Sequence, residues 1–324
     1  MDAVRRIADA VLYEGYVLWP YRKSAMKNQR RWTFGGVYPE GHSRAHPDDP
    51  AHMQAECLVQ GGPDAELLVS VRFLHVVARQ ALRAGPAGLE PVAELEAGGE
   101  RYVSWDEATE RELSSGPLRL GEPARLELDV PAGARTEPVE GGAVERSWAS
   151  LRAAVEIEPA ALRDGLHRLR VRVRNATPFE AGSRDQALRQ TLCSTHAVLR
   201  ARGGEFVSLT DPPEDLAEAA AACSNVGTWP VLVGEKDDRG TLLCSPIILP
   251  DYPEVAPESP GDLFDGGEID QLLILNILSL TDEEKREMRD SDPRVREILE
   301  RTEALTDEQL MALHGTIREF GLAR

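Results

Sequence analysis

Apolar and charged residues alternate along several short segments, and this alternation constrains the fold more than any other feature. It is present in 125–130, in 155–158 and in 168–174, where every second residue is Leu, Val or Ile and the residues between them are charged. A period of two is typical of strands with one buried and one solvated face. The nearly continuous apolar run 67–77 is typical of a strand buried on both faces. We therefore expect an antiparallel, β-sandwich-like body over residues 65–250.

Further segments fit the same body. The turn residues Pro159–Gly165 separate two of the alternating segments and predict that these pair as neighbours. Residues 195–209 are interpreted as a strand pair that turns at Gly203-Gly204. A short Ala-rich helix is expected at 216–222, and the last strands at 231–233 and 242–249.

The C-terminal part follows a different pattern. A linker rich in Pro, Gly and Asp covers 251–267, and helix-start signals then recur. Thr281 with Glu284 and Thr306 with Gln309 form capping boxes, and Asp292 precedes Pro293 as an N-cap followed by a proline at the first helical position. Helices are expected at 268–279, 282–290, 293–303 and 307–320. Residues 251–324 carry 19 acidic against 8 basic residues, which gives −11 of the chain's net −18. The predicted class is thus α+β, with an acidic helical C-terminal arm over 268–324.

The N-terminal part, residues 1–64, is expected to pack on the body. It begins with a short amphipathic helix at 3–12 and ends with a loop rich in Pro, Gly, His and Asp over 39–64. Between them, residues 13–38 hold four of the six tyrosines, two of the five tryptophans, and five basic residues without an acid from Arg22 to Arg31.

Charge and composition exclude some classes of function. A net charge of −18 disfavours non-specific binding to nucleic acid or to an anionic membrane. The longest apolar stretch, 272–280, is far shorter than the roughly 20 residues of a membrane-spanning helix, so we expect no membrane insertion. We find no secretory signal pattern at Met1. The four widely spaced cysteines favour reduced thiols, and we therefore expect a cytoplasmic protein.

The aromatic-basic segment is the first candidate site. Tyr, Trp and Arg dominate interface hot spots, and a pair of arginines binds carboxylates or phosphates well. A partner could therefore bind this segment; alternatively, the rings fill the core and the basic residues pair with the protein's own acidic arm. The candidate partner-binding residues are Tyr13, Tyr16, Trp19, Tyr21, Arg22, Lys23, Arg30, Arg31, Trp32 and Tyr38.

Four residues form a candidate metal site: His42, His46, His52 and Cys57. Three imidazoles and a thiolate could hold Ni, Fe or Zn, although the spacing matches no established metal signature. Exposed loop histidines are the alternative interpretation. Apart from this possibility, we expect no cofactor.

An arginine-rich segment and the absence of catalytic motifs also bear on function. The arginines at 168, 170, 172 and 174 could bind an acidic partner, or could pair across strands with Glu156 and Glu158. The sequence contains no G-x-S-x-G, P-loop, Rossmann, H-E-x-x-H or C-x-x-C motif, so it assigns no catalytic residue, and a non-enzymatic role is favoured.

Two groups of segments resemble a known family when taken together. The first is Leu12–Tyr21 with Arg31–Pro39, and the second is Phe206–Glu214, Asn225–Gly234, Ser245–Pro253 and Ala256–Asp265 with Leu280–Lys285. They resemble an uncharacterised family of bacterial proteins associated with gene clusters for uptake [NiFe] hydrogenases. The resemblance implies an accessory role in hydrogenase maturation or assembly, through contact with a hydrogenase subunit or maturation factor. It supplies no catalytic residues.

Three hypotheses follow. The first is a non-enzymatic accessory or scaffold protein with these contact surfaces, in which the helical arm could also mediate homo-oligomers. The alternative is a metal-handling protein or enzyme that uses His42, His46, His52 and Cys57. A β-sandwich that binds a small anionic ligand is a third possibility.

Overall fold

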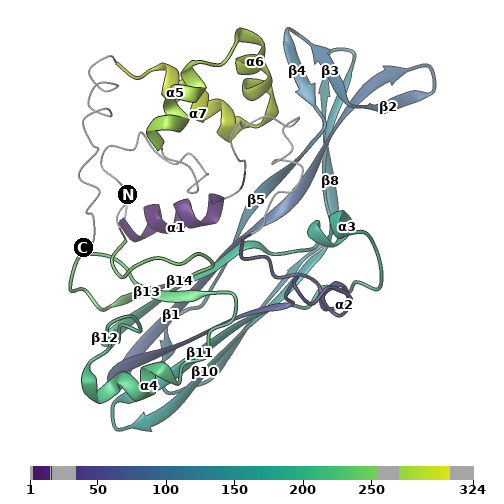
Figure 1. Ribbon diagram of the computed structural model, residues 1–324. Coiled ribbons are helices and arrows are strands. Elements are labelled where there is room, and N and C mark those ends of the chain that lie inside the picture. Colours follow the sequence, from purple (N-terminus) through teal and green to yellow (C-terminus); the bar gives the residue numbers. More distant parts are fainter. Residues whose placement is uncertain (1–2, 15, 17–33, 254–269, 307–324) are drawn as a thin grey trace. The chain divides into compact units, whose positions relative to one another are not determined.

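The computed structural model describes the chain except for residues 1–2, 15, 17–33, 254–269 and 307–324 (Figure 1). The chain divides into two compact units. The sheet unit contains residues 1–13 and 32–254, and the helical unit contains residues 14–31 and 255–324. The segment 1–64, which we expected to be one packing region, is therefore divided between the two units. The aromatic-basic segment 13–38 is divided in the same way, since Tyr13 and Tyr38 belong to the sheet unit and Tyr16 to the helical unit.

Twelve antiparallel strands form one sheet in the order β13-β14-β12-β1-β11-β10-β7. Strands β2, β5, β6 and β9 also pair with β1, β8 pairs with β9, and β3 and β4 form a separate hairpin. The strands are β1 (His52–Gly85), β2 (Gly88–Val92), β3 (Glu94–Ala97), β4 (Glu100–Val103), β5 (Trp105–Ser114), β6 (Leu118–Arg119), β7 (Ala124–Val130), β8 (Gly133–Val139), β9 (Gly142–Trp148), β10 (Leu151–Arg163), β11 (Leu166–Asn175), β12 (Cys193–Phe206), β13 (Trp229–Leu232) and β14 (Thr241–Ser245).

Strand β1 organises the sheet, because its 34 residues pair with six other strands. Residues 52–60 pair with β11, and residues 59–61 and 66–74 pair with β12. Farther along, residues 66–67 pair with β6, 70–79 with β5, 78–83 with β9 and 81–85 with β2. The register with β12 shifts between Gly61 and Glu66. Side chains from both parts of β1 belong to one apolar core, together with side chains from β10, β11, β12 and β14. The sheet therefore curves over its own core.

Helix α1 (Ala3–Tyr13) covers the outer face of the sheet. Its apolar residues Val4, Ile7, Ala8 and Val11 pack against buried side chains of β12, β13, β14 and the residue after β13, namely Val198, Val231, Val233 and Leu243. The neighbouring positions Ala197, Leu199, Leu232, Leu242 and Cys244 face the inner core instead. Alternation along these strands therefore serves two apolar layers, one inside the curved sheet and one beneath α1.

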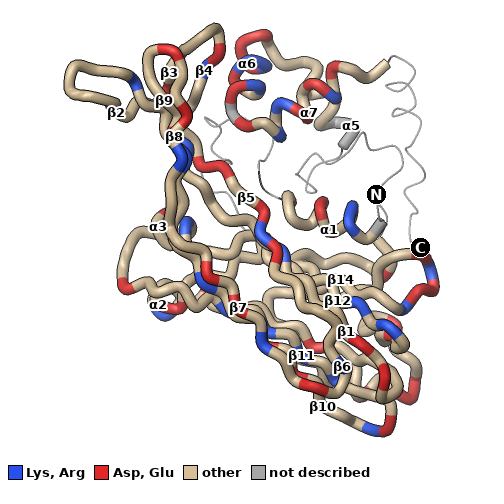
Figure 2. Tube along the Cα trace, turned by 180° about the vertical axis from the view of Figure 1, so that it is seen from behind, with Lys and Arg blue, Asp and Glu red and all other residues tan. Residues whose placement is uncertain are grey.

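The predicted pairing of the alternating segments is confirmed. Residues 168–174 lie in β11 and pair with β10, which in turn pairs with β7. Arg170 and Arg174 contact Glu158 and Glu156 across the strands, as the cross-strand alternative predicts. Figure 2 shows basic and acidic positions side by side on β7, β10 and β11.

Two glycine-rich segments differ from the expectation. The predicted strand pair at 195–209 is wrong, because β12 runs as one strand through Gly203 and Gly204. The loop predicted over 39–64 is wrong for its second part, because β1 begins at His52. Short helices lie elsewhere in the sheet unit: α2 (Glu40–Ser43), α3 (Arg184–Leu188), the 3-10 helix η2 (Glu214–Leu216) and α4 (Ala217–Ala221). The last two confirm the helix predicted at 216–222.

The helical unit contains α5 (Asp270–Leu278), α6 (Asp282–Ser291) and α7 (Pro293–Glu303). Thr281 forms the predicted capping box with Glu284, and Asp292 caps α7 by accepting a hydrogen bond from the backbone N–H of Arg294. The Tyr16 hydroxyl donates to the other carboxylate oxygen of Asp292 at 2.8 Å. The helix predicted at 307–320 lies outside the described residues. Over the described part of the chain, no helix is long and apolar enough to cross a membrane.

Candidate functional site: a polar pocket beside the N-terminal helix

A pocket of about 240 Å³ lies between α1 and the outer face of the sheet. Four segments of the sheet unit supply its lining: α1, the middle of β1, the end of β5 with Ser115, and β12. Three arginines, three serines and one glutamate provide the polar part of the lining, and Val, Leu and Ala side chains provide the rest. The lining residues are Val4, Arg5, Ala8, Leu68, Val69, Ser70, Arg72, Glu112, Ser114, Ser115, Val198 and Arg200.

Arg72 is the central residue of the pocket. Its neighbours Val71 and Phe73 face the inner core, so alternation turns the Arg72 side chain toward the outer face. There it lies opposite Glu112 of β5 and His196 of β12 in the strand register. The side chain is only 3 % exposed. A buried guanidinium is costly unless anions and hydrogen bonds compensate for its lost hydration.

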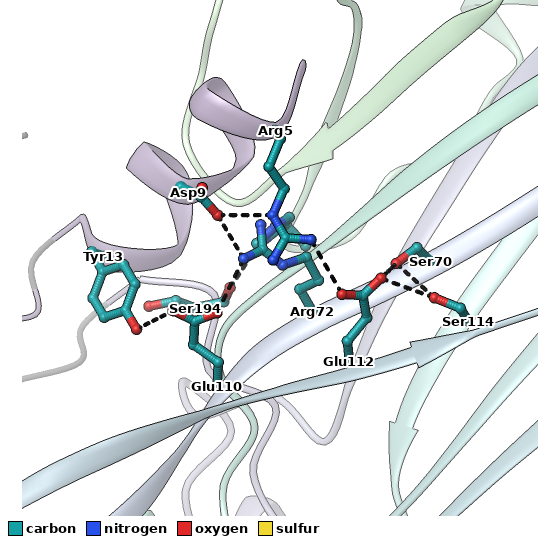
Figure 3. A network of polar contacts seen from close by, with 10 residues as sticks. Arg5, Asp9, Tyr13, Ser70, Arg72, Glu110, Glu112, Ser114 and Ser194 are labelled. Atoms are coloured by element: carbon teal, nitrogen blue, oxygen red, sulfur yellow. Dashed lines mark hydrogen bonds and ion pairs between the residues drawn. The ribbon is translucent and has the colours of Figure 1, made fainter. Parts of the chain in front are cut away.

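Only part of that compensation is present. The Nη2 atom of Arg72 contacts Asp9 Oδ1 at 2.6 Å and Glu110 Oε2 at 3.3 Å (Figure 3). The Tyr13 hydroxyl donates to Glu110 at 2.6 Å and so helps to fix that carboxylate. The Nη1 atom of Arg72 is buried and has no hydrogen-bond partner among the described residues. A charged donor group in the pocket wall is therefore left unsatisfied.

A second ion pair closes one side of the pocket. Arg5 lies between Asp9 at 3.3 Å and Glu112 at 3.4 Å, and thereby joins α1 to β5. Glu112 also accepts hydrogen bonds from the hydroxyls of Ser70 at 2.6 Å and Ser114 at 3.0 Å (Figure 3). Burial alone would raise the pKa of Glu112, but these hydroxyls and the nearby charges of Arg5 and Arg72 hold it below its ordinary value. Glu112 therefore stays ionised and compensated.

His196, which lies opposite Arg72 in the strand register, is neutral. His196 is fully buried, and burial lowers its pKa to about 4. Its Nδ1 lies 3.1 Å from the backbone carbonyl of Ser194, a residue with φ of +51°, so Nδ1 carries the proton and donates it. Neither His196 Nε2 nor Ser194 Oγ has a hydrogen-bond partner among the described residues. The outer face around Arg72 thus combines several unsatisfied polar atoms with one compensated ion-pair network.

The structure places three of the predicted contact residues in the interior. Tyr13, Tyr16 and Tyr38 are at most 3 % exposed, and their hydroxyls form hydrogen bonds with Glu110, Asp292 and Arg184. For these three tyrosines the structure agrees with the alternative in which the rings fill the interior. The other candidates lie outside the described residues: Trp19, Tyr21, Arg22, Lys23, Arg30, Arg31 and Trp32.

Two of the four candidate metal ligands do lie together. The ring of His42 stacks on His46 with centroids 4.4 Å apart and on Tyr38 at 5.2 Å. His42 Nε2 is 2.9 Å from Asp49, which also pairs with Arg184. Burial alone would raise the pKa of Asp49, but these two partners hold it below its ordinary value. This arrangement pairs His42 with Asp49 and Asp49 with Arg184, and it connects α2 to α3.

The other two candidate ligands are separate from that cluster. His52 and Cys57 lie five residues apart in the extended strand β1, and Cys57 is fully buried in the inner core. Burial raises the pKa of Cys57 well above its ordinary value, which disfavours the thiolate that a metal would need. Across the described residues, no group of three or more His, Cys, Asp or Glu side chains is arranged to hold a metal ion. The metal hypothesis therefore gains no support from this geometry.

One feature of the sequence does indicate the pocket. Arg72 and His75 interrupt the apolar run 67–77, whose other residues are typical of a strand buried on both faces. A charged residue inside such a run needs a buried partner or a ligand.

Comparisons with known proteins add no identification. No protein-family model matches the chain, and a search of curated proteins finds no significant match.

Proposed function

We propose that this protein is a non-enzymatic accessory protein that binds a partner protein through the pocket beside α1. One observation carries the proposal: Arg72 is buried in the pocket wall and keeps one terminal nitrogen without a partner among the described residues. A fold retains such a group at a cost in stability, and binding sites are where that cost is offset. The sandwich-like sheet body would act as a rigid platform for α1 and the pocket.

The ionisable groups at the pocket support binding rather than proton transfer. Glu112 has a lowered pKa and is compensated by Arg5 and two serines, so it stays ionised near neutral pH. His196 has a pKa of about 4 and stays neutral. A general acid or base works best with a pKa close to the working pH, and neither group meets that condition.

The resemblance of the segments around 12–39, 206–265 and 280–285 supplies the class of partner. We propose a subunit or maturation factor of a [NiFe] hydrogenase. In this role the protein would act by contact during assembly, with no chemistry of its own.

The test is affinity purification of the tagged full-length chain from its native host, followed by mass spectrometry. We expect hydrogenase subunits or maturation factors to dominate with the wild-type chain and to be lost with Arg72→Met. Arg174→Met is the matched control, since Arg174 is half exposed on β11 and lies outside the pocket lining. A wild-type chain that is purified without these proteins would overturn the choice of partner. Equal recovery from Arg72→Met and the wild type would overturn the role of the pocket.

A further inference from the structure

We infer that the pocket beside α1 binds a single carboxylate on a short aliphatic stem, such as a glutamate side chain or a peptide C-terminus. The inference rests on the proposed function and names the chemical group that the pocket recognises.

The donors point to a carboxylate. Nη2 of Arg72 is occupied by Asp9 and Glu110, neither of which lines the pocket, whereas Nη1 has no partner among the described residues. A guanidinium nitrogen donates strongly to carboxylate oxygens, and a buried one gains most from an anionic acceptor. The hydroxyl of Ser115 accepts the Val69 N–H at 2.9 Å, which leaves its own proton available as a second donor.

The walls point to an aliphatic stem. Apolar side chains of the lining come from α1, β1 and β12: Val4, Ala8, Leu68 and Val198. Val198 also belongs to the apolar layer under α1, so the pocket continues that layer. A ligand with methylene groups next to its charged end would bury them here, and burial of apolar surface favours binding.

Volume and charge limit the ligand further. About 240 Å³ is the space of roughly eight water molecules, at about 30 Å³ each. That space accommodates a side chain or a small acid. Arg5 contacts Asp9 and Glu112, and Arg72 contacts Asp9 and Glu110. Because these carboxylates already compensate most of the positive charge of the two arginines, the site has little excess charge to hold a dianion such as phosphate, whereas Nη1 of Arg72 offers a donor for one carboxylate.

The experiment is titration of the purified full-length chain, followed by NMR and calorimetry. The probes are butyrate, n-butanol, n-butylamine and inorganic phosphate. We expect saturable binding of butyrate only, weakened at least tenfold in Arg72→Met and unchanged in Arg174→Met. Binding of butanol as tight as that of butyrate, preferential binding of phosphate, or undiminished binding of butyrate to Arg72→Met would overturn the inference.

A second variant guards against a folding defect. Leu68→Phe enlarges an apolar side chain in the lining and leaves every charge in place. Circular dichroism establishes that each variant is folded. We expect Leu68→Phe also to weaken butyrate binding at least tenfold, and a folded Leu68→Phe protein that binds normally would contradict the placement of the ligand.

Titration with peptides distinguishes a failure of this inference from a failure of the proposed function. Blocked tripeptides with a central Glu or Gln test whether the carboxylate is carried by protein. Tighter binding of the Glu peptide than of butyrate supports both. If butyrate binds and the Glu peptide does not, the carboxylate site stands but the partner-protein function fails. If neither acid binds although native partners depend on Arg72, the function stands and the carboxylate inference fails.

Discussion

Strand β1 buries Glu56 in its first half and Arg72 and Arg79 in its second half, and the surroundings of Glu56 and Arg72 differ. In the first half, Glu56 accepts hydrogen bonds from Arg170 Nε at 2.7 Å and from the backbone N–H of Ser224 at 2.8 Å. In the second half, Arg72 has two carboxylates on Nη2 and no partner for Nη1 among the described residues. Both side chains are 3 % exposed.

The comparison distinguishes a charge with a structural role, Glu56, from a charge in the candidate site, Arg72. Glu56 is the buried member of an ion pair whose other member, Arg170, remains 39 % exposed and hydrated. Its surroundings are complete, and they connect β1 to β11 and to the segment after α4. Arg72 Nη1 has no acceptor among the described residues, and under the proposed function the partner supplies one. A buried charge that is only partly compensated calls for an explanation that a complete ion pair does not need.

The largest expected effect comes from removing the carboxylates that compensate Arg72. The double substitution Asp9→Asn with Glu110→Gln leaves a buried guanidinium without an anion on Nη2 and should destabilise the fold by about 3–5 kcal/mol. Chemical denaturation measures the free energy of unfolding. Adding Arg72→Met should recover most of the loss, because it removes the uncompensated charge. A loss below about 1 kcal/mol would mean that water or another group already compensates Arg72.

His196, which lies opposite Arg72, should make the free energy of unfolding decrease in acid. Its folded-state pKa is about 4 and the ordinary value is 6.5, so the unfolded state binds a proton first. Stability should fall as pH drops from about 6.5 to 4, by up to about 3 kcal/mol from this residue. His196→Gln should flatten that part of the profile. His75, with a pKa also lowered to about 4, should retain its own share, and an unaltered profile would contradict the assignment.

Glu56 should respond in a lower pH range. Burial alone would raise its pKa, but the Ser224 N–H and Arg170 hold it below the ordinary 4.5. Its contribution is present above pH 4.5 and is lost as pH falls through the lowered value. Glu56→Gln should cost about 1–3 kcal/mol at pH 7 and progressively less below pH 4.5. Glu158→Gln, at the exposed contact of the same Arg170, serves as the comparison.

The smallest effect is expected at the exposed pairs of β11. Arg174 Nη1 lies 3.7 Å from Glu156, and the arginine is 50 % exposed. Arg174→Ala should change the free energy of unfolding by about 0–1 kcal/mol, because solvent screens this pair. Measurement in 1 M salt should remove even that difference. A cost similar to that of Glu56→Gln would erase the distinction between buried and exposed charges drawn above.

Local patterns predicted the parts of the fold that local rules determine. Alternation over 168–174 predicted β11 and its cross-strand pairs with Glu156 and Glu158. Thr281 and Asp292 predicted two helix starts through their own side chains. In each case the interacting groups are close in sequence or follow a fixed period.

The glycines misled because their role depends on distant neighbours. Gly61 and Gly203-Gly204 suggested a loop and a turn, yet both strands continue through them. A Cβ on Gly61 would lie 2.8 Å from the Ala65 Cβ, and one on Gly204 would lie 2.7 Å from the Gln60 carbonyl oxygen. These glycines allow β1 and β12 to approach closely at the bend, which no local pattern reveals.

The pocket escaped prediction for the same reason. Arg5, Arg72 and Glu112 come from segments separated by 67 and 40 residues, and no spacing rule relates them. The sequence did show that Arg72 interrupts an apolar run, but it did not show which residues would compensate it. The metal hypothesis had the opposite weakness, since it grouped four residues by proximity in sequence while β1 extends two of them away from the others.

The length of β1 also has a consequence for synthesis. Its 34 residues emerge from the ribosome well before β11 and β12, whose last residues are 175 and 206. Until then, only the pairing with β2, β5, β6 and β9 is available, and the edge meant for β12 stays open next to the apolar run around Phe73. An open edge of this kind is a template for aggregation in a growing chain. Production of this protein should therefore depend on translation speed and on chaperones that shield β1 until β12 has been made.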